Sequence, residues 1–304
     1  MSIQTEIKRH TLRTLASMKG KERVAMLTAY DVVTAACLDE AGVDILLTGD
    51  SLGNVVYGFE STLPVTLDMI LAHTASVVRG SSTAFVVADL PFMTFQVSAE
   101  EALKNAGRCL AEAGAHGVKL EGAYPEMCDT IRRLVQAGIP VMGHIGLTPQ
   151  SVHQMGGYYT HGKTESSAER LLREAKALEA AGCFAIVLEC VTEALAREIT
   201  HEVKCLTIGI GSGAVCDGEV LVVNDMLGFS PGKSPKFAPP RLDLKKIVKE
   251  VAASYVLDVK GAAFLPATAE PVRVPVPPPP PPSSVAMPQG RPRGVFDIRP
   301  ERTQ

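Results

Sequence analysis

The stretch ILLTGDSLG, residues 45–53, begins as an apolar run of strand length and ends in an acidic residue, a hydroxyl group and two glycines. A carboxylate at the end of an apolar strand costs free energy unless it meets water, a cation or a ligand. Later apolar runs also end at or near ionisable side chains, namely Asp89, Lys119 with Glu121, His144 and Glu189. We therefore predict that Asp50 and these residues converge on an active site.

The periodicity of apolar residues around this stretch predicts strands that alternate with helices. The predicted strands are 24–29, 45–49, 84–88, 117–121, 140–144, 184–188, 206–210 and 221–223. The predicted helices are an N-terminal helix over 7–19, followed by 31–41, 66–79, 98–114, 125–138, 166–182, 192–203 and 242–257. Eight strands over about 250 residues favour an α/β fold, a (β/α)8 TIM barrel, and a doubly wound sheet is the competing architecture. A barrel carries its site at the C-terminal ends of the strands, which is where the ionisable residues fall.

Composition narrows the class of protein. The chain has 304 residues, 46% of them hydrophobic, and a formal net charge of -3, so we expect no nucleic acid and no membrane as a partner. Its seven cysteines have no paired spacing, which suits a reducing compartment. No apolar run approaches the roughly 18 residues of a membrane-spanning helix, and the N-terminus lacks the apolar middle of a signal peptide. We therefore expect a cytoplasmic protein.

The composition changes near residue 266. Prolines become frequent and include an unbroken run from Pro277 to Pro282. Such a segment favours extended polyproline II over helix or sheet. We predict a barrel domain over 1–265 and a disordered proline-rich tail over 266–304, which is either a passive extension or a ligand for a proline-binding module.

The carboxylates of Asp50, Asp89 and Glu121 are hard oxygen ligands. Three carboxylates at one barrel mouth repel one another unless a cation lies among them. Oxygen-only ligation suits Mg²⁺. Separate helix caps or exposed salt bridges are the alternative for any single carboxylate, but the position of all three on neighbouring strand ends favours a shared site.

The other ionisable residues have more than one interpretation. Lys119 is two residues before Glu121, on the same face of a strand, and could bind a substrate oxyanion, form a Schiff base or pair with an acid. Glu189 follows four apolar residues, and a carboxylate partly removed from water suits general acid–base catalysis; a backbone or arginine partner is the alternative. His144 could be an acid–base group, an orienting group or a hydrogen-bonded barrel histidine, so its role is left open.

Longer motifs occur in a fixed order along residues 7–265. They are MLTAYD (26–31), TGDSLG (48–53), STLPVT (61–66), ADLPFM (88–93), VKLEG (118–122), GHIGLTPQSV (143–152), ALEAAG (177–182), VLECV (187–191) and IGIGSG (208–213). With these motifs the chain resembles the ketopantoate hydroxymethyltransferase (3-methyl-2-oxobutanoate hydroxymethyltransferase) family. It departs from the family pattern at Ser212, where alanine is common, at Phe59, where histidine is frequent, and in the tail.

The resemblance implies an enzyme of pantothenate and coenzyme A biosynthesis. The implied reaction transfers a hydroxymethyl group from 5,10-methylenetetrahydrofolate to 3-methyl-2-oxobutanoate, giving 2-dehydropantoate and tetrahydrofolate. The resemblance also implies a homodecamer with one Mg²⁺ per subunit, held by Asp50 and Asp89 with Glu121 as the third carboxylate. Asp50, Ser51, Asp89 and Lys119 would contact the oxoacid, and Glu189 would accept the proton.

Two other functions are weighed against this one. Another Mg²⁺-dependent barrel enzyme acting on 2-oxo acids, of the phosphoenolpyruvate mutase or isocitrate lyase type, would need a catalytic cysteine loop or a phosphate-binding set that the sequence lacks. A non-catalytic scaffold would use the barrel to present its tail. The retention of ionisable residues at the strand ends argues against a scaffold.

Overall fold

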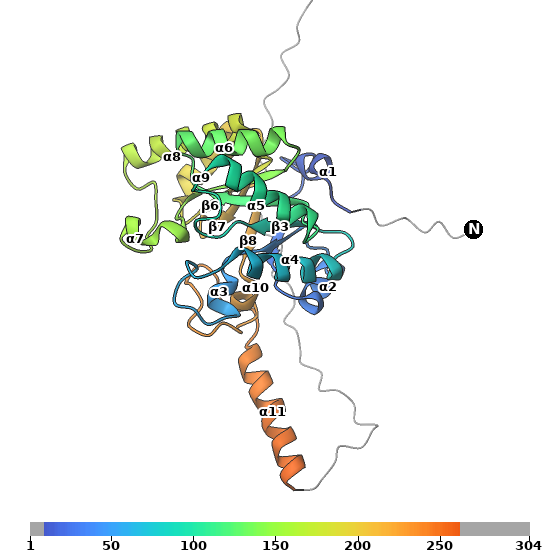
Figure 1. Cartoon of the computed structure of the whole chain (residues 1–304). Helices are drawn as coiled ribbons and strands as arrows, with labels where there is room; N and C mark the ends of the chain where they lie inside the picture. The colour runs from blue at the N-terminus through green and yellow to red at the C-terminus, as the bar shows by residue number, and fades with distance from the viewer. Residues whose placement is uncertain (1–8, 262–304) are drawn as a thin grey trace, which may run out of the picture. The chain divides into compact units, whose positions relative to one another are not determined.

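Eight parallel strands close into a barrel in the computed structural model, which describes residues 9–261 (Figure 1). The strands are β1 (Val24–Thr28), β2 (Ile45–Thr48), β3 (Phe85–Asp89), β4 (Gly117–Glu121), β5 (Val141–Gly146), β6 (Ala185–Glu189), β7 (Leu206–Ile210) and β8 (Gly218–Leu221). Each strand pairs in parallel with the next, and β8 pairs in parallel with β1, with Gly218 opposite Val24. This closure confirms the predicted (β/α)8 barrel and excludes the doubly wound sheet, which is open at both edges.

Helices surround the sheet, and α4, α5, α6, α8 and α9 each pack against the next (Figure 1). The helices are α1 (Leu12–Ala16), α2 (Val32–Glu40), α3 (Leu52–Val55), α4 (Leu67–Gly80), α5 (Ala99–Ala111), α6 (Pro125–Gln136), the 3₁₀ helix η1 (Pro149–Ser151), α7 (Val152–Met155), α8 (Glu165–Ala181), α9 (Glu193–Glu202), α10 (Val223–Met226) and α11 (Leu244–Lys260). Side-chain caps fix several starts, since Asp31 accepts hydrogen bonds from the backbone at the start of α2 and Ser98 does so at the start of α5. The N-terminal helix is shorter than the predicted 7–19.

The eighth strand lies closer to the N-terminus than predicted. Val223 belongs to α10, and it is apolar because it packs in the core cluster between barrel and helices. The sequence pattern did not place a strand at Gly218, because glycine is depleted in strands. A Cβ at Gly218 would lie 2.5 Å from the carbonyl oxygen of Val24, so the close approach of β8 to β1 requires glycine there.

Strand residues alternate between two apolar layers. One layer fills the inside of the barrel and includes Phe85, Val87, Met142, Val187 and Ile208. The other packs against the helices and includes Val118, Leu120, Ile186 and Leu188. Because the alternation continues to the strand ends, the ionisable residues two positions after members of the inner layer share its direction: Asp89 follows Val87, His144 follows Met142 and Glu189 follows Val187.

Some predictions concern segments away from the barrel. The predicted tail, 266–304, lies outside the described residues, and the domain boundary at 265 stays a prediction. Within residues 9–261, none of the helices combines the length and the apolar character needed to cross a bilayer. The last helix, α11, buries none of its residues, and its Val251, Tyr255 and Leu257 are exposed.

Candidate active site

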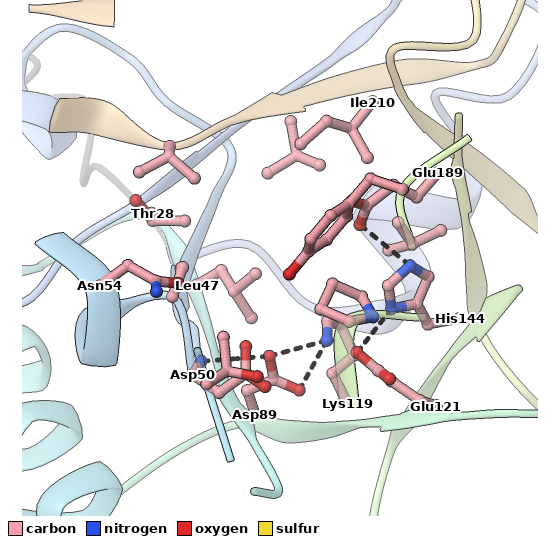
Figure 2. Close-up of a pocket in the computed structure, with 17 residues that line it drawn as sticks. Thr28, Leu47, Asp50, Asn54, Asp89, Lys119, Glu121, His144, Glu189 and Ile210 are labelled. Atoms are coloured by element: carbon pink, nitrogen blue, oxygen red, sulfur yellow. Dashed lines mark hydrogen bonds and ion pairs between the residues drawn. The ribbon is translucent and has the colours of Figure 1, made fainter. Parts of the chain in front are cut away.

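One cavity at the C-terminal ends of the strands brings the predicted site residues together (Figure 2). Asp50 and Ser51 follow β2, Asp89 ends β3, Lys119 and Glu121 lie on β4, His144 lies on β5 and Glu189 ends β6. The cavity has a volume of about 170 Å³. The structure therefore places every sequence-predicted site residue at one mouth of the barrel.

Lys119 forms a buried ion pair with Asp89. Its Nζ lies 2.6 Å from Asp89 Oδ1 and 2.7 Å from Oδ2, and the two residues are direct neighbours in the pairing of β3 with β4. Burial alone would lower the pKa of the lysine, but the negative charges of Asp89, Glu121 and Asp50 together outweigh burial and hold the pKa above the usual range. The charged form of the amine is therefore favoured, which supports the ion pair over the Schiff base among the predicted roles.

Asp50 is a buried carboxylate with little to stabilise its charge. Its backbone N–H donates to Asp89 Oδ2 (3.3 Å), and its own Oδ2 accepts from Gln150 Nε2 (3.0 Å). Burial, followed by the negative charges of Asp89 and Glu121, raises the pKa of Asp50 to about 7. Burial also raises the pKa of Asp89, although Lys119 opposes that shift. The predicted repulsion among the three carboxylates is thus present.

His144 lies between two carboxylates. Its Nδ1 is 3.4 Å from Glu121 Oε1 and its Nε2 is 3.2 Å from Glu189 Oε2, although neither contact has hydrogen-bond geometry. Burial lowers the pKa of the imidazole, but the two carboxylates outweigh burial and raise it to about 9. Figure 2 shows this chain of three residues beside the Asp50–Asp89–Lys119 chain. The two carboxylates therefore favour the protonated form of His144, a residue whose role the sequence left open.

The backbone around Glu189 is fixed by unusual local geometry. The next residue, Cys190, has a φ of 49°, which is rare for a residue other than glycine. Ser212 Oγ donates to the carbonyl of Leu188 (2.7 Å) and accepts from the N–H of Val191 (3.0 Å), so one buried hydroxyl holds both sides of the turn. The departure from the family pattern at Ser212 is therefore accommodated by hydrogen bonds.

Two further polar residues that sequence reasoning missed support the site. Tyr30 Oη lies 2.9 Å from Ser51 Oγ, and Gln150 contacts two of the carboxylates. Both stand in motifs of the family pattern, MLTAYD and GHIGLTPQSV, which is the only signal that could have indicated them. Neither is ionisable in the ordinary pH range, and the strand-end pattern does not reveal them.

The donor set fits a hard divalent cation. Asp50, Asp89, Glu121 and Glu189 are four acidic groups that face two basic groups, Lys119 and His144, so the acidic groups outnumber the basic ones by two. Within the described residues, no three candidate ligand side chains converge closely enough to form a complete metal cage. Mg²⁺ does not need such a cage, because it keeps several waters and uses one or two carboxylates together with substrate oxygens.

The fold and this cavity define the class: a TIM-barrel enzyme with a charged site at the C-terminal mouth. Comparison with known proteins gives the family. The sequence profile described as ketopantoate hydroxymethyltransferase matches residues 9–267. A 3-methyl-2-oxobutanoate hydroxymethyltransferase of Syntrophus aciditrophicus is 51% identical over 265 residues, which cover 87% of this chain and 97% of the relative. One of Pseudothermotoga lettingae is 53% identical over 248 residues, covering 82% and 93%.

Among solved structures, a phosphoenolpyruvate phosphomutase from Streptomyces platensis has a similar fold. The two share a TM-score of 0.57 and 15% sequence identity, over 83% of this chain and 88% of the other. At that identity the likeness shows the fold alone. The chain belongs to the ketopantoate hydroxymethyltransferase family, and it is a transferase.

Proposed function

We propose that the chain transfers a hydroxymethyl group from 5,10-methylenetetrahydrofolate to 3-methyl-2-oxobutanoate, which gives 2-dehydropantoate and tetrahydrofolate in pantothenate biosynthesis. About half of the aligned residues are identical to those of relatives named for this activity. The observation that carries the proposal is the division of the cavity: Glu189 lies on one side and the cluster of Asp50 and Asp89 on the other (Figure 2). A substrate between them would meet a base and a site for its oxygens at the same time.

Glu189 acts as the base. The substrate must lose the proton on C3, next to the ketone, before C3 can form a bond to the one-carbon unit. Glu189 is the most accessible of the four carboxylates, with 16% of its side chain exposed, and His144 lies against its other face. A positioned base contributes a factor of roughly 10² to 10⁴ to the rate. C3 then forms a bond to the methylene carbon of the folate, water supplies the hydroxyl oxygen, and both bonds from that carbon to folate nitrogens break. The two nitrogens take up the proton lost from C3 and one proton from the water, which gives tetrahydrofolate.

Asp50 and Asp89 would hold one Mg²⁺ per subunit, with Glu121 as the third carboxylate of the site. When bound, the ion would polarise the 2-oxo group as a Lewis acid, an effect worth several kcal/mol. Lys119 supplies a fixed positive charge for the substrate carboxylate. Ser51 supplies a hydroxyl that Tyr30 holds in place at 2.9 Å.

The remaining wall of the cavity accommodates the rest of the substrate. Val187, Ile210 and Val220 line it and offer an apolar surface to the isopropyl group of the oxoacid. A volume of about 170 Å³ has room for this small acid but not for a folate as well. The methylene carbon would therefore be presented from the mouth of the barrel.

We extend the proposal to assembly and location. The exposed apolar side chains of α11, among them Val251, Tyr255 and Leu257, would be covered by other copies of the chain in a homodecamer. Light scattering coupled to size-exclusion chromatography measures the number of subunits, and a monomeric mass would overturn the assembly. The scattered free cysteines suit a cytoplasmic enzyme.

Deuterium exchange tests the proposed reaction. The protein is incubated with 3-methyl-2-oxobutanoate in D₂O, with Mg²⁺ or with EDTA, and the C3 proton is followed by NMR. We expect exchange with Mg²⁺ and little with EDTA, and formation of 2-dehydropantoate when the folate is added. Exchange that is equal in EDTA would overturn the metal site alone. No exchange and no product in any condition would overturn the function and favour the lyase or scaffold alternatives.

A further inference from the structure

Gln150 is a buried polar residue that the proposed reaction does not use. It lies in η1, directly after β5, and only 4% of it is exposed. Its contacts reach residues on three other strands or strand ends. We infer that Gln150 is the positioning residue that fixes Asp50 and Glu121 relative to each other before a cation binds, an inference that rests on the proposed metal site.

Gln150 donates hydrogen bonds to two of the three carboxylates of the proposed metal site. Its side-chain Nε2 donates to Asp50 Oδ2 at 3.0 Å. Its backbone N–H donates to Glu121 Oε2 at 3.1 Å. Asp89, the third carboxylate, is held by Lys119 instead. One residue therefore fixes the two carboxylates that lack a lysine partner.

The orientation of the Gln150 amide is determined by its neighbours. Besides Asp50, Nε2 donates to the carbonyl oxygen of Leu90 at 3.0 Å, so both of its hydrogens face acceptors. The amide oxygen accepts from Gln96 Nε2 at 3.3 Å. The reverse orientation would place oxygen against oxygen at Asp50 and Leu90. The amide can therefore only present its donor to the carboxylate.

The backbone explains how a loop residue reaches this position. Gly146 ends β5 with a φ of 96°, and a Cβ there would lie 2.3 Å from the carbonyl oxygen of Glu189. The N–H of Leu147 donates to that same carbonyl at 2.8 Å. The chain therefore turns tightly against the end of β6, and η1 follows within the site.

The chemistry of an amide suits this role. Asp50 and Glu121 repel each other, and hydrogen bonds from a neutral donor hold both in place without cancelling the negative charge that attracts a cation. A lysine or arginine in its place would neutralise that charge. Groups that orient metal ligands in this way typically change metal affinity 10- to 100-fold when removed.

The test substitutes Gln150→Met, which keeps the length of the side chain and deletes its three side-chain hydrogen bonds, while the backbone bond to Glu121 stays. Mn²⁺ is used as the probe, and its binding to the full-length protein is measured by electron paramagnetic resonance without substrate. We expect affinity to fall about 10- to 100-fold, and the C3 exchange rate to recover at saturating metal. A melting temperature well above the assay temperature without metal shows that the lower affinity does not come from unfolding, since metal would also rescue a partly unfolded variant.

Asn105→Leu is the matched control. Asn105 is also a buried amide, and its Nδ2 donates to the carbonyl of Thr94 at 2.7 Å without lining the cavity. We expect this variant to lower the melting temperature without a change in Mn²⁺ affinity. Equal losses of affinity in both variants would overturn the inference, because they would reflect destabilisation only.

The outcomes separate this inference from the function on which it rests. If the wild-type protein binds no Mn²⁺, the metal site falls and the inference falls with it. If the wild type binds and folded Gln150→Met binds equally well, the inference alone is wrong. If Gln150→Met does not fold, Gln96→Leu decides, because it removes the donor that orients the amide and leaves every contact of Gln150 with the carboxylates; a smaller loss of affinity supports the inference and none overturns it.

Discussion

Two acidic residues with little exposure, Asp39 and Asp50, lie near opposite ends of β3 and have opposite environments. Asp39 accepts hydrogen bonds from the hydroxyl of Ser81 and from the backbone N–H groups of residues 82–84, just before β3 begins. Burial would raise the pKa of Asp39, but these donors lower it to about 2. Asp50 lies beside Asp89, where β3 ends, and burial with neighbouring negative charge raises its pKa to about 7.

The difference shows what each end of the barrel is for. At the N-terminal end of β3 the protein supplies every partner that a carboxylate needs, so the residue serves the fold. At the C-terminal end the protein supplies fewer hydrogen-bond donors than the carboxylates can accept, so their negative charge is balanced only when a ligand binds. A carboxylate in a cavity with a strongly shifted pKa indicates a functional site. The contrast between the two ends of β3 supports this assignment for Asp50.

The largest effect is expected from Glu189→Gln, which removes the base and keeps the shape. C3 exchange should fall by a factor of roughly 10² to 10⁴ while the melting temperature stays near that of the wild type. Glu193→Gln, on an exposed residue of α9, is the control and should exchange normally. NMR measures both variants, and wild-type exchange in Glu189→Gln would exclude the proposed role.

Asp89→Asn tests the buried ion pair at the charged end. The substitution leaves the ammonium of Lys119 buried without its carboxylate hydrogen-bond partner, and the free energy of unfolding should fall by about 3–5 kcal/mol. Adding Lys119→Met should recover part of this stability but no activity. Urea denaturation provides the measurement, and a single variant as stable as the wild type would contradict the ion pair.

Asp39→Ala addresses the other end of β3. It leaves buried backbone N–H groups unpaired, so the free energy of unfolding should fall by about 1–3 kcal/mol while C3 exchange per folded molecule is unchanged. Because the folded-state pKa is lowered, the stabilisation is present above the unfolded pKa of about 4 and is lost as pH falls toward 2. The wild type and the variant should therefore converge in acid, and a constant difference would argue against the hydrogen-bonded carboxylate.

The last prediction concerns the pH dependence of stability in the metal-free protein. Asp50 has a folded-state pKa raised to about 7, so between about pH 4 and pH 7 the folded protein binds more protons than the unfolded chain. Stability should therefore decline as pH rises through this window. Asp50→Asn should remove that part of the decline, and Mg²⁺ should reduce it. Thermal denaturation from pH 4 to pH 7 checks this, and an unchanged slope in Asp50→Asn would assign it to another group.

The sequence predicts the acidic residues at the C-terminal end of the barrel better than the acidic residue Asp39 at the N-terminal end. Asp50, Asp89, Glu121 and Glu189 could be found because a carboxylate after an apolar run is visible in one dimension. Asp39 could not, since on a helix it looks like any surface acid until residues 81–84 are placed beside it. Gln150 was missed for a related reason: its partners lie after β2, after β3 and on β4, and only the closed barrel brings them together.

Errors in the predicted fold have similar causes. The strands with continuous apolar runs, such as β3 and β6, could be located because both of their faces are buried. β8 could not, because it has only four residues, of which Gly218 is a poor strand former and Glu219 is exposed, so Val220 and Leu221 are its only large apolar residues. The short helices α3, α7 and α10 contain too few residues to show a period.

The pairing of β8 with β1 has a consequence for synthesis of the chain on the ribosome. The carboxylates, Lys119 and His144 all lie between residues 50 and 189. Other residues of the cavity wall, Thr28, Val220 and Val222, lie on or beside β1 and β8, the two strands that close the barrel. Contacts between segments so distant in sequence form only after the intervening chain has been made. A growing chain therefore carries all of these charged residues before the barrel can close around them. Closure needs β8, which is the last of the eight strands to leave the ribosome.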